Sequence, residues 1–557
     1  MMTSRSPCLS ASPRRISKFT AAALFALTTA TCRQMCLSFV VALCAGGMAA
    51  AQTNAKVTVN LAKELNILTS TSVGVPAIMS DGNTFNLATA SYLKVAGIST
   101  VRFPGNHTAA DLYHWSTNTA SKYKGFDPIY LAPGSNFGTI ATVADKMGTA
   151  FVVVNYGSNE QSTGGGEPAE AAAWVAYANG DPSDSKAIGK DSTGHDWQTV
   201  GYWASIRAQA PLAADDGMNF LRIGHTSPIK IKLWQVGDEV YRNGYYGGDH
   251  TGEPDLHGPA PNAVKDFAKL RKDANLSPAF YGAKLTEFAA AMKAVDPTIQ
   301  IGAALATPPD MMSWASDWNT SVLKKACKDL DFVSLEWTTG GTLPPDYKTL
   351  NEEDLLNSAR GQLNGILSGV LYDYKTSCPA GHIPRIAFAP AAAISWAKVE
   401  RPISIGLWAA DTYALLVESG SVNVSWSDMY SDAMMSNDRK KFGAVYSSLQ
   451  MFHIIAHAPG DILVDAASNT PKLAVHATKR RDGFTAIMLI NKDPQNAITA
   501  KVSIAGGPVG AKGKRFDYGI TQQKAGLPTV PSEIKDLGAE FTVTVPPYSI
   551  TDVLIEN

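Results

Sequence analysis

Two glutamates stand directly after short apolar runs that are typical of buried β-strands. Glu239 follows the run 229–236, and Glu336 follows the run 332–335. Two carboxyl groups held near each other can divide proton donation and nucleophilic or base attack between them. Asp428, after the run 422–426, is a third acidic candidate. These positions predict an acid–base site built from strand ends, with Glu239 and Glu336 as its catalytic pair.

Polar and aromatic side chains at similar positions predict groups that hold a substrate. Arg102 lies in one strand-like run, and Asn155 ends another. Tryptophan and tyrosine rings follow several runs; because such rings also seal the end of a core, we expect about half of them to be structural. The substrate-binding candidates are Arg102, Asn106, Asn155, Trp234, Asp238, Tyr241, Trp337, Trp426 and Asp428.

The elements that must position these groups follow from the hydrophobic pattern. Between about residues 60 and 450, β-branched runs alternate with longer Ala-rich helical stretches. Eight such units close into a parallel barrel whose reacting groups sit at the carboxyl ends of the strands. The expected barrel strands are 71–78, 99–103, 150–155, 229–236, 300–304, 332–335, 385–388 and 422–426.

The pattern changes after about residue 459 to short alternating strands with Gly, Pro and Asn turns. This predicts an α/β fold class, a (β/α)8 TIM barrel with a C-terminal antiparallel β-sandwich domain. We expect the barrel domain over 52–458 and the sandwich over 459–557, with the option that part of the mature N-terminus joins the sandwich. The expected sandwich strands are 472–478, 485–491, 500–504, 540–546 and 550–555.

Residues 1–51 are predicted to be a signal peptide or targeting segment. Basic residues precede a first apolar run, and a second run over 37–44 ends before the small residues 48–51, a pattern that signal peptidase accepts. Met35 is an alternative start, because 35–51 alone makes a compact signal peptide. We therefore expect an exported protein, periplasmic or extracellular.

Composition narrows the range of partners. The chain has 48 basic and 49 acidic residues, so no net field favours nucleic acid. Beyond the presequence no run reaches the roughly 20 apolar residues that span a bilayer, so we expect no stable membrane anchor. Cys/His spacing predicts no metal site, and we expect no cofactor.

Cys327 and Cys378 are the only cysteines after residue 51; a disulfide and two buried thiols explain them equally well.

Three motifs resemble those of clan-A glycoside hydrolases and, within them, family-51 α-L-arabinofuranosidases. Residues 102–106 resemble the family's Arg-x-Pro-Gly-Gly element, 170–180 its Glu-Ala-x-x-Trp-Val-x-Tyr-x-Asn-Gly helix, and 234–239 its Trp-x-x-Gly-Asn-Glu strand. The resemblance extends to 443–464 and to 545–551. It implies a carbohydrate substrate or ligand, rings that stack on sugar faces, and Glu239 as general acid/base.

The chain departs from the family pattern at two positions. Asp238 stands where the family has an Asn that donates to a sugar 2-hydroxyl, and an ionised Asp only accepts. The nucleophilic Glu expected after 385–388 is absent, because the run continues Ala389, Pro390, Ala391. Glu336 either supplies a displaced second carboxylate or pairs with Arg102. Carboxyl separations of about 5–5.5 Å go with retention of configuration and about 6.5–9.5 Å with inversion.

Two functional hypotheses follow. The first is an exported glycoside hydrolase, α-L-arabinofuranosidase-like, that uses Glu239 as general acid/base and an unorthodox partner carboxylate. The second is a catalytically degenerate barrel that binds glycans without hydrolysis. Retention of Glu239 and Arg102 favours the first, whereas the two departures favour the second. A scaffold role is a third reading.

Overall fold

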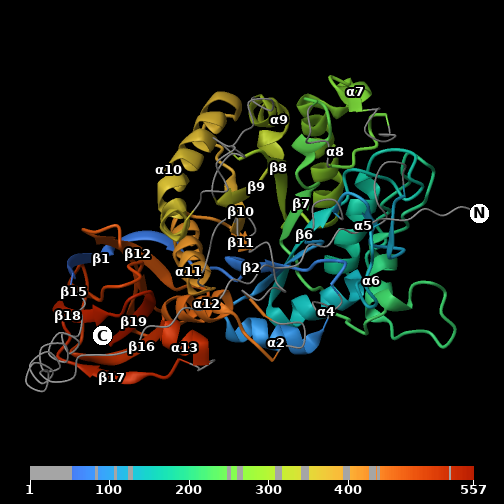
Figure 1. The fold of residues 1–557 in the computed structure, drawn as a ribbon. Helices are drawn as coiled ribbons and strands as arrows, with labels where there is room; N and C mark the ends of the chain where they lie inside the picture. Colours follow the sequence, from blue (N-terminus) through green and yellow to red (C-terminus); the bar gives the residue numbers. More distant parts are fainter. Residues whose placement is uncertain are drawn as a thin grey trace, which may run out of the picture. The chain divides into compact units, whose positions relative to one another are not determined.

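Eight parallel strands form a closed barrel in the computed structural model (Figure 1), which confirms the predicted fold class. The structure describes residues 53–81, 86–105, 110–122, 129–247, 253–259, 267–307, 317–339, 351–392, 402–425, 434–435, 440–525 and 529–557. In barrel order the strands are β2 (Val73–Pro76), β3 (Thr100–Phe103), β6 (Thr149–Val154), β7 (Leu233–Val236), β8 (Gln300–Leu305), β9 (Phe332–Thr339), β10 (Arg385–Ala392) and β11 (Asn423–Ser425).

Helices connect these strands, and local sequence explains where they begin. Asn351 and Asp354 form a reciprocal capping box at the start of α10, and Ser277 caps α8 just before Pro278. The helices are α2 (Leu87–Val95), α4 (Phe137–Met147), α5 (Pro168–Asn179), α6 (Val200–Ala208), α7 (Phe267–Leu270), α8 (Pro278–Val295), α9 (Trp318–Ala326), α10 (Glu352–Ser377), α11 (Pro402–Glu418), α12 (Ala444–Ile455) and α13 (Ile520–Ala525). Shorter elements are η1 (Asn219–Leu221), η2 (Val240–Arg242), η3 (Ala274–Leu276), η4 (Cys327–Asp329), β4 (Tyr113–His114) and β5 (Thr119–Ala120).

The strand register decides which side chains enter the barrel. Phe151, Leu233 and Phe332 belong to one buried cluster inside it. Because side chains alternate between the two faces of a strand, residues two positions apart point the same way. Gln235 on β7 therefore points inward with Leu233, and Glu336 on β9 points inward with Phe332. Arg102 pairs in register with Phe151 and shares its direction.

The C-terminal domain is a sheet of nine strands that are mostly antiparallel. Apolar residues of seven of these strands share one core, including Val57, Val475, Val502 and Val543. Strand β1 lies between β12 and β15 although it comes from the start of the described chain. The strands are β1 (Thr53–Ile67), β12 (Ile462–Ser468), β13 (Leu473–Lys479), β14 (Phe484–Asn491), β15 (Ile498–Ala505), β16 (Lys512–Gly519), β17 (Ser532–Lys535), β18 (Glu540–Val545) and β19 (Ser549–Glu556).

A buried charge cluster joins the barrel helices to this sheet. Asp411 on α11 accepts from Lys492 Nζ at 2.7 Å and from His476 Nε2 at 2.9 Å. Arg360 on α10 also contacts Asp411, and Glu418 faces His476 Nδ1 at 2.7 Å. Every charge in this cluster therefore has an oppositely charged neighbour, as burial requires.

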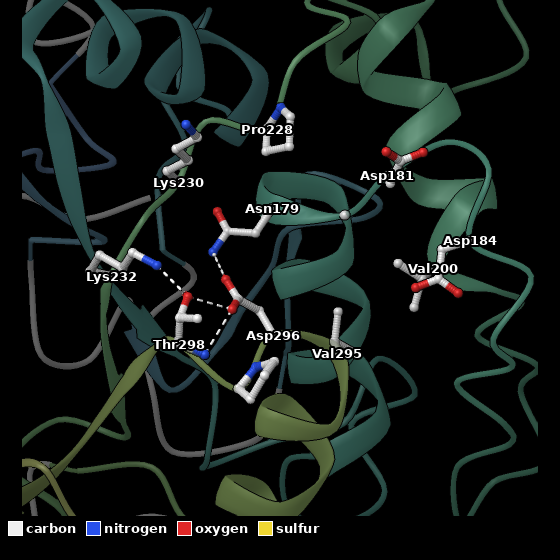
Figure 2. Close-up of a pocket in the computed structure, with 12 residues that line it drawn as sticks. Asn179, Asp181, Asp184, Val200, Pro228, Lys230, Lys232, Val295, Asp296 and Thr298 are labelled. Carbon is white, nitrogen blue, oxygen red and sulfur yellow. Dashed lines mark hydrogen bonds between the residues drawn. The ribbon is translucent and has the colours of Figure 1, made fainter.

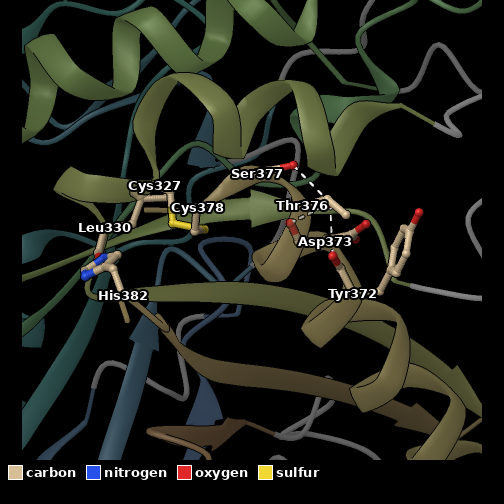
Figure 3. Close-up of a disulfide and its surroundings, with 8 residues drawn as sticks. All are labelled: Cys327, Leu330, Tyr372, Asp373, Thr376, Ser377, Cys378 and His382. Atoms are coloured by element: carbon tan, nitrogen blue, oxygen red, sulfur yellow. Dashed lines mark hydrogen bonds between the residues drawn. A yellow bond between two sulfur atoms is a disulfide. The ribbon is translucent and has the colours of Figure 1, made fainter. Parts of the chain in front are cut away.

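Cys327 and Cys378 form a disulfide (Figure 3). The bond links η4 to the residue that ends α10, across a sequence separation of 51. It therefore fixes the far end of the longest described helix to the segment that precedes β9.

A polar hollow of 390 Å³ lies at the amino ends of β7 and β8 (Figure 2). Asp296 accepts from Asn179 at 2.9 Å and from Thr298 at 2.6 Å, and Lys232 donates to Thr298. Polar groups at this end of a barrel generally serve stability, whereas functional groups lie at the carboxyl ends of the strands. Among the described residues, no helix is both long and apolar enough to cross a membrane.

Candidate functional site

Arg102 lies at the centre of a buried polar cluster at the carboxyl ends of the strands. Its Nη2 is 2.6 Å from Asp238 Oδ1 and 3.8 Å from Glu336 Oε1. Gln235 Oε1 lies 3.4 Å from the same nitrogen, and the guanidinium packs over the ring of Phe151. Arg102 thus connects β3 with Asp238, which follows β7, and with Glu336, which lies within β9.

Glu239 is held in place by a tight bend after β7. Gly237 and Glu239 both adopt left-handed backbone conformations, with φ of 68° and 42°. The Glu239 side chain is buried, and Tyr241 donates its hydroxyl to Oε1 at 2.9 Å. Arg242 Nη1 lies 3.1 Å from Oε2. Two donors therefore fix the orientation of this carboxylate, and its negative charge helps to raise the pKa of Arg102.

Glu336 is the second carboxylate of the cluster and enters from β9. Its side chain is 28% exposed. Burial raises the pKa of Glu336, and the negative charge of Asp238 raises it further, against the opposing charge of Arg102. In the register of β9 and β10, Glu336 pairs with Ala389, and the sequence of β10 contains no carboxylate. Glu336 is thus the cross-strand neighbour of Ala389, the first residue after the predicted strand 385–388.

Only one of the two carboxylate oxygens of Asp238 accepts hydrogen bonds from side chains of the cluster. Its Oδ1 accepts from Arg102 and, at 2.9 Å, from Gln235 Nε2. Its Oδ2 is buried and has no hydrogen-bond partner within the part of the chain that the structure describes. The buried Nε of Arg102 likewise has no acceptor there. These two atoms therefore keep unused hydrogen-bonding capacity inside the cluster.

A second carboxyl pair, Asp111 and Glu253, lies beneath this cluster. Asp111 accepts three backbone hydrogen bonds, from Tyr156 and Gly157 at 2.8 and 2.9 Å and from Asp238 at 2.8 Å. Burial raises the pKa of Asp111 to about 7, and it raises the pKa of Glu253 well above its ordinary range. The pair therefore holds a proton near neutral pH.

The structure brings together five residues that the sequence predicts for the site: Arg102, Asp238, Glu239, Tyr241 and Glu336. Trp234 and Trp337 lie elsewhere, because they alternate with the inward-pointing Gln235 and Glu336. Trp234 is fully buried and donates to Ile231 O, and Trp337 donates to Gln362 on α10.

Asn155 is buried at the end of β6 and hydrogen-bonds Ser158 and the carbonyl of Tyr113, so it organises its own loop. Asn106, Trp426 and Asp428 lie outside the described residues. Within the described ranges, no group of three or more His, Cys, Asp or Glu side chains is arranged to hold a metal ion.

Four residues of the site were not predicted from sequence: Gln235, Arg242, Asp111 and Glu253. Strand alternation carries a signal for Gln235, since it shares the direction of Arg102 and Glu336. Arg242 follows Glu239 by three residues, a spacing that brings side chains together in a helical turn. No sequence signal marks Glu253, which reaches the cluster from an irregular segment.

The arrangement provides what acid–base chemistry requires. It holds two carboxylates from different strand ends, Glu239 and Glu336, with an arginine between their loops, in a largely buried environment where charges interact strongly. One of them has a raised pKa and can carry a proton at neutral pH. Such a site can donate a proton and accept one within the same cluster.

Solved structures with this architecture include an α-L-arabinofuranosidase from Thermotoga maritima in complex with arabinose. It is 17% identical, with a TM-score of 0.61 over 90% of this chain and 100% of that one. The GH51 α-L-arabinofuranosidase from Thermotoga petrophila is 16% identical, with a TM-score of 0.62 over 90% and 100%. A family-44 xyloglucanase from Paenibacillus polymyxa is 14% identical, with a TM-score of 0.57 over 90% and 99%.

No protein-family model and no curated protein sequence matches the chain. At such low identity the structural likeness establishes a shared fold, which is that of these glycoside hydrolases: a (β/α)8 barrel with a C-terminal β-sandwich.

Proposed function

We propose that this chain is an exported glycoside hydrolase, resembling α-L-arabinofuranosidases, with Glu239 as general acid/base. The observation that carries the proposal is the convergence of Glu239 and Glu336 on the Arg102 cluster at the strand ends. Glycoside cleavage requires one carboxylic acid that protonates the leaving oxygen and a second carboxylate that attacks the sugar or activates water. The fold shared with arabinofuranosidases supports the same reading.

Glu239 is the residue we assign to proton transfer at the leaving oxygen. Its place directly after β7 matches the motif in which the family carries its acid/base. The Tyr241 hydroxyl and the Arg242 guanidinium hold the carboxylate from two sides, so it needs little reorganisation when a substrate binds.

Glu336 is the residue we assign as the partner carboxylate. It is an inward side chain of β9, and Ala389 is its neighbour on β10, the strand where the family carries its nucleophile. The unpartnered Oδ2 of Asp238 lies in the same cluster and can accept a hydrogen bond from a sugar hydroxyl.

A glycan-binding barrel without hydrolysis is the second candidate. The absence of a carboxylate from β10 favours it, and so does the use of Asp238 as the ion-pair partner of Arg102. In this reading Glu239 and Asp238 accept hydrogen bonds from sugar hydroxyls, and no bond is cleaved.

A substrate screen separates the two candidates. Wild type, Glu239→Gln and Glu336→Gln are incubated with aryl α-L-arabinofuranosides and with arabinan, xylan and β-glucan oligosaccharides, and binding to the same sugars is measured by calorimetry. The matched control is Glu533→Gln, a change at an exposed position on β17. Hydrolysis by wild type and control that both cluster variants lose supports the enzyme; binding without turnover in every protein supports the lectin-like alternative.

Export is proposed on two grounds. Residues 1–51 have the composition of a presequence, and the Cys327–Cys378 disulfide is of the kind that persists in oxidising compartments. Expression of the full chain with its presequence, followed by N-terminal sequencing of the exported product, tests this. The expected N-terminus lies near Gln52, and retention of the whole chain in the cytoplasm would contradict it.

A further inference from the structure

The carboxyl pair Asp111–Glu253 lies outside the roles assigned so far, and its geometry is specific. Asp111 is fully buried on the segment that follows β3. Its Oδ1 accepts from the backbone N–H groups of Tyr156 and Gly157, and its Oδ2 accepts from that of Asp238. A single side chain thus connects the loops that follow three successive barrel strands, β3, β6 and β7.

Glu253 completes this arrangement from further along the connection that follows β7. It is buried, and neither of its oxygens has a donor among the described residues. An ionised carboxylate offers about four lone-pair sites, of which Asp111 has filled three with N–H donors. A Cβ built at Gly157 would meet both Pro254 O at 2.1 Å and Asp111 Cβ at 2.8 Å, so the segment of Glu253 lies against Asp111. Burial raises the pKa of Glu253, and the charge of Asp111 raises it further. Two ionised carboxylates have no proton to donate, so a hydrogen bond between Glu253 and Asp111 requires that the pair keeps one proton.

The segment around Glu253 packs tightly against the same loops. Leu256 N donates to Gly157 O at 2.7 Å, and Asn243 donates to Asp255 at 2.9 Å. A Cβ at Gly157 would lie 2.1 Å from the carbonyl oxygen of Pro254, so only glycine permits this approach. The segment is therefore anchored by the three residues that directly follow Glu253.

We infer that Asp111 is a positioning residue for Glu239: it holds the N–H of Asp238, the residue before Glu239, and a proton shared with Glu253 keeps Asp111 in place. The role in catalysis rests on the proposed function, whereas the shared proton does not. The charged and titratable groups that face the pair are Asp238, Glu239, Asp255, Arg242, Tyr156 and Tyr281.

Glu253→Gln tests the shared proton without any substrate. Glutamine has nearly the shape of protonated glutamic acid and donates to Asp111 at every pH. Thermal unfolding of wild type, Glu253→Gln and the exposed control Glu533→Gln is followed from pH 5 to pH 8.5. In wild type the folded state must keep its proton as pH rises, so its stability falls, whereas the glutamine variant avoids this loss.

We expect the Tm of Glu253→Gln to match wild type at pH 5 and to exceed it by about 2 °C at pH 8.5. Infrared spectra should contain a protonated-carboxyl C=O band at neutral pH in wild type and in Glu533→Gln that is reduced in Glu253→Gln. A Tm difference that does not change with pH, together with an unchanged band, would overturn the shared proton.

Rescue tests the positioning role on whichever glycoside the chain hydrolyses. Glu253→Ala should lower kcat by about tenfold or more with KM changed less than about threefold, and Glu253→Gln should recover most of the loss. Equal losses in the two variants would refute positioning through this bond. If the chain hydrolyses no glycoside, the proposed function fails, while the Tm and infrared results still decide whether the proton is shared.

Discussion

Arg102 and Asp238 form a buried ion pair with 2.6 Å between Nη2 and Oδ1. The arginine comes from β3 and the aspartate from the bend after β7, so the pair closes the gap between two strands that are separated in the barrel by β6. It also determines which atoms of the cluster are left to meet a ligand.

Removing Arg102 should strongly destabilise the fold. Arg102→Ala leaves Asp238 and Glu336 without their buried counter-charge, and loss of one partner of a buried pair costs roughly 3–5 kcal/mol. Asp238→Asn should cost less, because its amide oxygen still accepts from Arg102. Urea unfolding measures both. Lys63→Ala, which breaks an exposed pair with Asp465, is the control and should leave the midpoint unchanged. Equal midpoints for Arg102→Ala and wild type would contradict the buried pair.

The pH profile of hydrolysis should reveal the protonation state in which Glu336 acts. Its pKa is raised from the ordinary 4.5 by burial and by Asp238. A partner carboxylate acts in its ionised form, so kcat/KM should rise with pH through a value well above 4.5. Any residual kcat/KM of the Glu336→Gln variant should not show this rise with pH. A profile that instead falls over the same range would assign proton donation to Glu336.

His476 should make stability depend on pH near neutrality. Burial alone would lower the pKa of His476, but Glu418 and Asp411 raise it above 6.5. The folded state therefore binds a proton that the unfolded state releases, so this contribution is fully present below pH 6.5 and is lost as pH rises through the folded pKa. Chemical unfolding of wild type and His476→Gln from pH 5.5 to 9 should show a stability gap that narrows with pH. The exposed His195 provides the control, since His195→Gln should keep the wild-type pH dependence.

Loss of the disulfide should lower stability measurably. Cys327 and Cys378 are separated by 51 residues, and closing a loop of that size restricts the unfolded chain by about 4 kcal/mol in the chain-entropy description. Urea unfolding of the double variant Cys327→Ala/Cys378→Ala should therefore show a lower midpoint. Reductant should lower the midpoint of wild type and leave that of the double variant unchanged. A wild-type midpoint that reductant does not move would argue against the bond.

The sequence predicts the barrel well because its strands are short apolar runs that alternate with longer helical stretches. All eight barrel strands overlap the apolar runs from which they were predicted. The predicted strand 385–388 continues in the structure to Ala392, through alanines and a proline of weak strand propensity that pairing with β9 overrides. Strands β12, β16 and β17 were not predicted, and β1 was anticipated only as the option that part of the mature N-terminus joins the sandwich. The partners of β1 lie some 400 residues further on, where no local pattern can register them.

The candidate site also contains residues that the sequence could predict and residues that it could not. Glu239, Glu336, Arg102 and Asp238 are predictable because each lies at or just after a strand end. Trp234 and Trp337 show the limit of that rule, since an aromatic residue near a strand end faces the helices when its neighbour faces the interior. The contact between Asp111 and Glu253 depends on an irregular segment that folds back beneath the cluster, and such an approach is set by tertiary packing.

The interior place of β1 in the nine-stranded sheet imposes an order on folding. A ribosome makes β1 before every residue of the barrel, yet both of its neighbours, β12 and β15, are made after the whole barrel. Until both neighbours are made, the backbone groups on both edges of β1 have no strand to pair with. Such unpaired edges are prone to pair with other chains. The barrel can mature ahead of the sheet, so a late species with a formed barrel and an incomplete sandwich should be the one that chaperones recognise.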